Sequence, residues 1–142
     1  MNYGRIALAG LGGFAAYFIL GGLLFVLFPS MRNEFLKYPA VYRTKEAMTG
    51  LLPAGMAAMF VAILALAVLY ALVYRGGSGL AEGARFGALI GIFSVGSFVV
   101  LHDHVNLNIG LTLTLQTAAA YFVEWTVTGT VIGLIYRPVL PR

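Results

Sequence analysis

The chain has 142 residues, of which 61% are apolar and only 10% are charged, against about 25% in an average soluble domain. Its mean hydropathy is +0.91. One small core cannot hide that much apolar surface, so the composition excludes an ordinary soluble enzyme and a disordered chain. The absence of cysteine excludes a disulfide scaffold, a thiol nucleophile and an iron–sulfur cluster. We therefore predict an all-α polytopic membrane protein, with four transmembrane helices in one compact bundle that occupies residues 1–142.

The first predicted span is the uncharged run at residues 6–28, whose 23 residues are enough to cross a bilayer. No small-x-small cleavage site closes the run, so we expect it to remain uncleaved. The polar stretch that follows carries Met31, Phe35 and Tyr38 on one helical face. This spacing predicts a short amphipathic helix at the membrane surface, broken at Pro39, with a solvated loop as the alternative.

Three further spans are predicted at residues 50–74, 82–103 and 113–136. The uncharged part of the third, residues 86–101, has only 16 residues, so its ends must snorkel or be covered, or the bilayer must thin around it. Four spans place both termini on one side. Five basic residues fall on that side and four on the other, which favours cytoplasmic termini in a bacterial inner membrane. The first group is Arg5, Arg75, Arg85, Arg137 and Arg142, and the second is Arg32, Lys37, Arg43 and Lys45.

Glu124 is the main functional candidate, because it is an acid inside the fourth span. It lies 12 residues before Tyr136, about 18 Å along a helix and close to the bilayer midplane. A charge there is costly, so we expect the carboxyl to face the bundle interior, to be paired, or to be protonated. Helical spacing joins it to a polar stripe that contains Gln116, Thr117, Tyr121 and Thr128, with Trp125 beside it.

This stripe predicts a proton or cation relay or a ligand contact, and the alternative is a hydrogen-bonded carboxyl that only joins helices. No other charged side chain is expected at the depth of Glu124. Its partner then comes from another subunit or from uncharged residues of the same chain, for which the candidates are Gln116, Tyr121, Thr128, Tyr17, Ser94 and Ser97.

Two other groups of residues attract attention. His102, Asp103 and His104 are potential metal or haem ligands, although a polar helix end is the favoured interpretation because no further His or Cys completes a site. Small residues at intervals of four predict close helix packing in the third and fourth spans. These are Gly83, Gly87, Gly91, Gly129 and Gly133.

The second half of the chain resembles families of small four-helix bacterial membrane proteins of unknown function. The resemblance rests on GIFSVGSFVVL at residues 91–101, an Asn-rich turn, and VEWTVTGTVIG at residues 123–133. In this chain the acid and the tryptophan are adjacent, whereas we expect the families to separate them. The resemblance implies a four-span fold and no substrate.

We expect a non-enzymatic integral membrane protein that acts through assembly, as a homo-oligomer or as an accessory subunit of a larger complex. The chain is small and rich in glycine, and it carries no known catalytic motif. The alternative is a small proton- or cation-coupled transporter or channel built on Glu124, and a weaker one is a metal or haem protein using His102 and His104. Apart from that metal or haem no cofactor is expected. The expected partners are the lipid bilayer and other membrane subunits, not nucleic acid.

Overall fold

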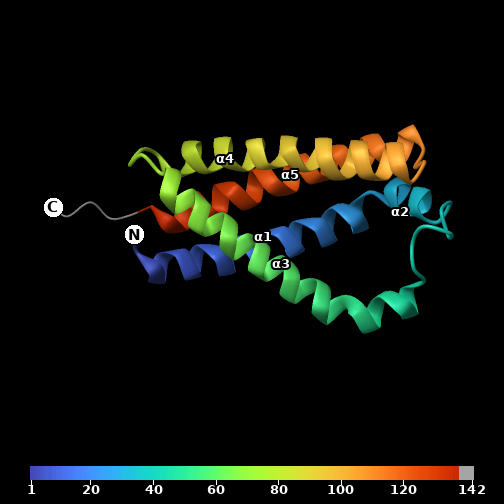
Figure 1. The fold of residues 1–142 in the computed structure, drawn as a ribbon, viewed down its shortest axis with the longest axis horizontal. Helices are drawn as coiled ribbons and strands as arrows, with labels where there is room; N and C mark the ends of the chain where they lie inside the picture. The colour runs from blue at the N-terminus through green and yellow to red at the C-terminus, as the bar shows by residue number, and fades with distance from the viewer. Residues whose placement is uncertain (138–142) are drawn as a thin grey trace.

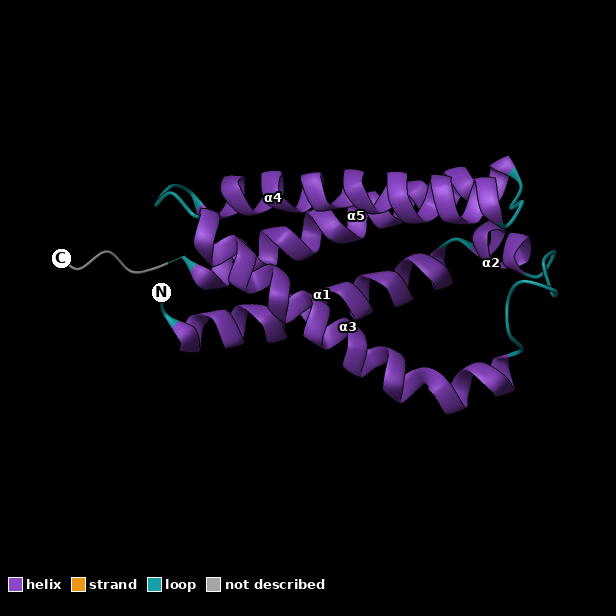
Figure 2. Ribbon diagram, in the orientation of Figure 1, coloured by secondary structure: helices purple, strands orange, loops and turns teal. Residues whose placement is uncertain are grey.

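The computed structural model describes residues 1–137, which form helices joined by short loops and contain no strand (Figures 1 and 2). The helices are α1 (Tyr3–Leu27), α2 (Pro29–Phe35), α3 (Lys45–Val73), α4 (Gly79–Ser94), the π-helix η1 (Val95–Asn106) and α5 (Leu111–Tyr136). Since η1 continues directly from α4, this part of the chain has four helical segments long and apolar enough to cross a membrane. The predicted all-α, four-span bundle is confirmed.

Polar caps set where three of the spans begin. The side chains of Asn2, Thr44 and Ser78 each accept a hydrogen bond from a backbone N–H in the first turn of α1, α3 and α4. These helices therefore start three to five residues before the predicted positions 6, 50 and 82. The apolar runs mark the part of each helix that suits the hydrocarbon, and the caps extend the helix beyond it.

The third span changes from α-helix to π-helix after Ser94. The N–H of Leu107 donates to the carbonyl of His102, five residues back. Such i to i+5 bonding is rare in proteins and is usually limited to a single turn. Here it carries the span on to Asn106, beyond the predicted end at residue 103.

The closest helix contact joins α4 and α5, which lie side by side in Figure 1. It is lined by the five glycines singled out in the sequence, Gly83, Gly87, Gly91, Gly129 and Gly133. A Cβ added to Gly87 would lie 2.9 Å from the Cα of Thr126, and one added to Gly133 would lie 2.8 Å from the Cα of Gly83. The glycines therefore let two backbones approach at a distance that no other residue permits.

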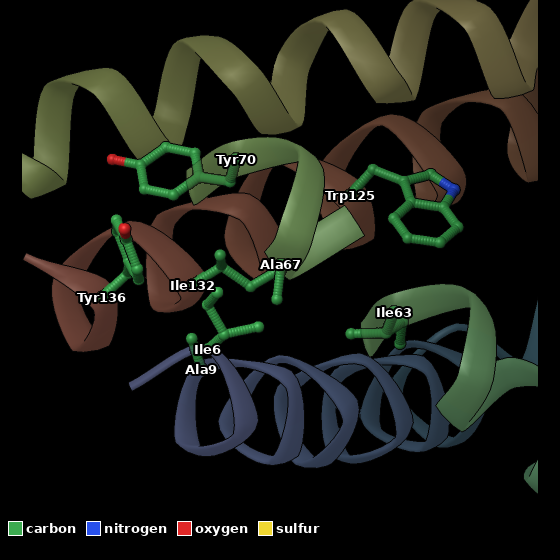
Figure 3. Close-up of a cluster of buried hydrophobic side chains, with 8 residues drawn as sticks. All are labelled: Ile6, Ala9, Ile63, Ala67, Tyr70, Trp125, Ile132 and Tyr136. Carbon is green, nitrogen blue, oxygen red and sulfur yellow. The ribbon is translucent and has the colours of Figure 1, made fainter. Parts of the chain in front are cut away.

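A hydrophobic cluster joins α1, α3 and α5 (Figure 3). It contains Ile6 and Ala9 of α1, Ile63, Ala67 and Tyr70 of α3, and Trp125, Ile132 and Tyr136 of α5. Tyr136 and Trp125 lie at opposite ends of the cluster in the figure. All three α3 members come from its second half, so the cluster holds only that half of α3 to the bundle.

The first half of α3 stands apart from the other helices. Every residue from 45 to 58 is exposed. Figure 1 shows this half diverging from α1 towards the end of the molecule at which α2 lies. Apolar residues there, such as Leu51, Leu52 and Met56, have no partner in the described chain.

Specific hydrogen bonds mark the two ends of the bundle. At one end the guanidinium of Arg5 donates to the carbonyl of Arg137, which brings the start of α1 to the end of α5. At the other end the N–H of Gly110 donates to the hydroxyl of Tyr38 at 2.8 Å. The first and third loops therefore meet at the end opposite the start of α1.

A short helix forms at residues 29–35, as predicted, but it is shorter than expected, and its predicted place at the membrane surface stays a prediction. It ends at Phe35, four residues before Pro39, so Tyr38 lies outside it. The Phe35 ring packs against Phe25 of α1 at 6.1 Å and against Tyr42 at 4.6 Å between ring centroids. These contacts fold α2 back against the bundle.

Candidate functional site

The candidate site is centred on Glu124, which lies midway along the 26-residue α5. Its side chain is turned into the bundle, and the residue is only 8% exposed. Gly21 of α1 lies across from it. A Cβ added to Gly21 would lie 2.8 Å from Oε1 of Glu124, so the missing side chain at Gly21 makes the space that the carboxyl group occupies.

One aromatic residue, Tyr17, lies beside the carboxyl group, and a second, Trp125, packs on Tyr17. Tyr17 lies one turn before Gly21 on α1, and its side chain approaches Glu124. The Tyr17 ring also packs on Trp125, with 4.9 Å between ring centroids and an interplanar angle of 44°. Trp125, the residue after Glu124 on α5, thus packs against α1.

No basic residue neutralises Glu124 within residues 1–137. The ion pairs in this range are Lys37 with Glu34 and His102 with Asp103, both outside the helical core. Removing a charge from water is costly, and an uncompensated carboxylate at this depth is costlier still. An ionised Glu124 would therefore lack a counter-charge within residues 1–137.

A cavity of about 280 Å³ opens beside Glu124. Its wall is formed by α1, α2 and α5 and is mostly apolar and aromatic, with Phe18, Phe25, Met31, Phe35 and Tyr121 among the lining residues. Because Met31 and Phe35 belong to α2, the cavity reaches from the middle of α5 to the end of the bundle where α2 lies.

The predicted polar stripe of α5 is divided in the structure. Tyr121 lines the cavity with Glu124, but Gln116, Thr117 and Thr128 do not. Gln116 lines an adjoining cavity of about 310 Å³, where its amide donates to the Ser30 hydroxyl at 3.3 Å. Helical spacing therefore identified the face of α5 that is turned into the bundle, but only part of that face lines the cavity beside Glu124.

Several polar atoms on the inward faces are buried without a hydrogen-bond partner in the described chain. They are the indole nitrogen of Trp125 and the oxygens of Gln116 (Oε1), Thr128 and Tyr70. Buried polar groups are nearly always satisfied in proteins, by water or ligand if not by the chain. Three of these four residues lie on α5, within eight positions of Glu124.

Of the partners considered for Glu124, only Tyr17 and Tyr121 share its cavity. Ser94 and Ser97 do not line it, and the Ser97 hydroxyl is used within its own helix. The contribution of Gly21 and of the α2 residues was missed. The adjacent glycines at positions 21 and 22, one turn after Tyr17, were the available signal.

The two histidines lie at the end of η1, and their side chains make separate contacts. His102 pairs with Asp103 at 2.9 Å, whereas Nδ1 of His104 donates to the carbonyl of Ile109 at 2.6 Å and lies 3.1 Å from the Thr114 hydroxyl. In residues 1–137 no three His, Asp or Glu side chains gather as metal ligands would. The arrangement closes the turn before α5.

Comparison with known protein families, with curated proteins and with solved structures finds no match to this chain.

Proposed function

We propose that this chain is a small, non-enzymatic membrane protein that binds and releases a proton or cation at Glu124, as a transporter or channel. One observation supports it: a carboxyl group without a basic partner in the described chain lies midway along α5 and faces a cavity that extends to α2. Acidic residues placed in this way inside a membrane are typical of ion and proton pathways.

The proposed chemistry is an exchange at one carboxyl group. When Glu124 is protonated it is neutral and suits its apolar surroundings. When it loses the proton, a cation in the cavity compensates the charge, and the Tyr17 hydroxyl is close enough to help orient the carboxylate. Since the two occupants exclude each other, the movement of one is coupled to the movement of the other.

The test is a proton flux measurement on purified protein in liposomes with a trapped pH dye. An outward potassium gradient without valinomycin supplies the driving force, because exchange of one proton for one monovalent cation moves no net charge and does not respond to a voltage. We expect the wild type to acidify the liposomes and Glu124→Gln to reduce the rate at least tenfold, because the amide keeps the shape but cannot ionise. The control is Glu46→Gln, the same chemical change at an exposed first-turn residue of α3. If wild-type and Glu124→Gln liposomes leak equally, the proposal fails.

A second candidate function, assembly with other subunits, is favoured by the first half of α3. An apolar helical segment with every residue exposed from 45 to 58 offers a long lateral surface to another protein. A homo-oligomer is the simplest case, and it would also enclose a pathway that four helices alone leave open. Native mass spectrometry from lipid nanodiscs should then give a multiple of 15.2 kDa. A particle that remains monomeric in nanodiscs and mild detergents contradicts this candidate.

We further propose that both termini lie in the cytoplasm of a bacterial cell, with the bundle in the inner membrane. The support is the count of basic residues in the sequence, with five on the side of the termini and four between the first two spans. Arg142, which made the predicted difference, lies outside the described residues. Reporter fusions to the N-terminus and to the first loop test the orientation.

A further inference from the structure

We propose that the cavity beside Glu124 binds an organic ammonium ion, that is, a positively charged nitrogen carrying one aromatic or branched apolar group. This inference rests on the proposed role of Glu124 and specifies the chemical class of the cation. It is carried by three features of the cavity: its charge, its wall and its size.

The charge of the cavity favours a cation. Glu124 is the one ionisable acid among the described residues that line it, and no Lys, Arg or His is among them. A bound cation would supply the missing counter-charge in surroundings where the attraction is only weakly screened by water. An anionic or zwitterionic ligand would leave a negative group unpaired beside the carboxylate.

The wall of the cavity favours an organic ion over a metal ion. Calcium takes six to eight oxygen ligands, and magnesium requires six in octahedral geometry. The described wall offers one carboxyl group and two tyrosine hydroxyls, from Tyr17 and Tyr121. It offers five aromatic rings, which belong to Tyr17, Phe18, Phe25, Phe35 and Tyr121. Aromatic faces attract alkylammonium ions, and they do so more strongly where water is excluded.

The size and position of the cavity limit the ligand. Its volume of about 280 Å³ lies just below the range of about 300–1,000 Å³ typical of small-molecule sites, so one ring with an ammonium group is a suitable occupant. The adjoining cavity shares Leu24, Met31 and Ala120 with it and adds about 310 Å³ of mainly apolar space. A ligand that entered near α2 would therefore meet apolar walls first and the carboxyl group last.

The test measures binding of benzyltrimethylammonium to the full chain in nanodiscs, by isothermal titration calorimetry and by tryptophan emission. The quaternary nitrogen stays charged at every pH. Trp125 is the only tryptophan in the chain and packs on Tyr17 of the cavity wall, so its emission reports on this site. Neopentylbenzene, in which carbon replaces the charged nitrogen, is the matched neutral ligand, and empty nanodiscs correct for partitioning into lipid.

We expect saturable binding of the cation to the wild type, at least tenfold weaker binding to Glu124→Gln, and no comparable binding of neopentylbenzene to the wild type. The comparison of the two ligands uses wild-type protein alone, so it decides the question even if the variant fails to fold. The inference is overturned if the cation does not saturate, if the neutral ligand binds equally well, or if Glu124→Gln binds the cation as the wild type does.

The flux assay and the binding assay test different proposals, and either proposal can be contradicted while the other stands. If Glu124→Gln abolishes proton flux while the wild type shows no charge-selective binding, the organic cation is wrong and the role of Glu124 stands. If binding is selective and depends on Glu124 but proton flux does not, the ligand class stands and the proton-coupled function is wrong.

Discussion

At the scale of single residues, the candidate site depends on a missing side chain as much as on the carboxyl group. Gly21 leaves the space that Glu124 fills, and the atom that a Cβ would meet is the far end of a flexible side chain. Gly21→Ala should therefore displace the carboxylate without moving α1 from α5. We expect proton flux to fall at least threefold while the thermal unfolding temperature stays close to that of the wild type.

The control for this change is the next residue. A Cβ at Gly22 meets nothing within 4 Å, so Gly22→Ala makes the same chemical change in the same turn and leaves Glu124 in place. We expect it to retain most of the flux. Equal flux in both variants would mean that the position of the carboxyl group against α1 is unimportant, contrary to the proposed role.

The residues of the site were only partly predictable from the sequence. Glu124, Tyr121 and Trp125 stand out because polar groups and tryptophan are rare at the middle of a span. Gly21 was not identified, since glycine spacing shows that a helix can be approached closely but not by which residue. Gln116 and Thr128 share the inward face with Glu124, but Gln116 lines the adjoining cavity and Thr128 lines neither cavity.

At the scale of helices, the contact between α4 and α5 is the part of the fold least able to accept a larger side chain. The Cβ of Gly87→Ala would lie 2.9 Å from both the Cα and the carbonyl oxygen of Thr126, and these backbone atoms cannot rotate away. We expect the helices to be forced apart, with a loss of about 1–3 kcal/mol in the free energy of unfolding. Reversible unfolding in mixed micelles, followed by circular dichroism, measures the change.

Gly55→Ala is the matched control for this prediction. A Cβ at Gly55 meets nothing within 4 Å in the exposed half of α3, so we expect unchanged stability or a gain of about 0.5–1 kcal/mol from the better helix former. If the two substitutions change stability equally, the close approach of α4 and α5 does not contribute to folding in the way described.

The helices themselves were more predictable than the residues of the site. Four apolar runs gave four spans, because a segment of about 20 apolar residues has few alternatives to crossing a bilayer. The helix starts at Tyr3, Lys45 and Gly79 were missed by a few residues, since each is set by a cap outside the apolar run. The change to π-helix after Ser94 was not predicted, because apolar periodicity does not distinguish π from α bonding.

At the scale of the whole molecule, the two halves of α3 differ within the described residues. The second half is held by Ile63, Ala67 and Tyr70 in the buried cluster, whereas every residue from 45 to 58 is exposed. The cavity of Glu124 is walled by α1, α2 and α5 and does not use α3. Assembly through α3 is thus compatible with a working site in each copy, and the two candidate functions can be tested independently.

The absence of cysteine makes assembly through α3 directly testable. Ala57→Cys places one thiol on the exposed half of α3, and Leu89→Cys places one on the exposed side of α4, as a control inside another span. If copies associate through α3, oxidative cross-linking in native membranes should convert at least half of Ala57→Cys to a covalent dimer and little of Leu89→Cys.

The yield of cross-linked Ala57→Cys dimer should persist when the protein is diluted with lipid, because a specific contact does not depend on random collision. It should also persist in an Ala57→Cys, Glu124→Gln double variant, since the site and the α3 surface are separate. Equal cross-linking at both positions, or none at Ala57→Cys, would show that the exposed half of α3 faces lipid.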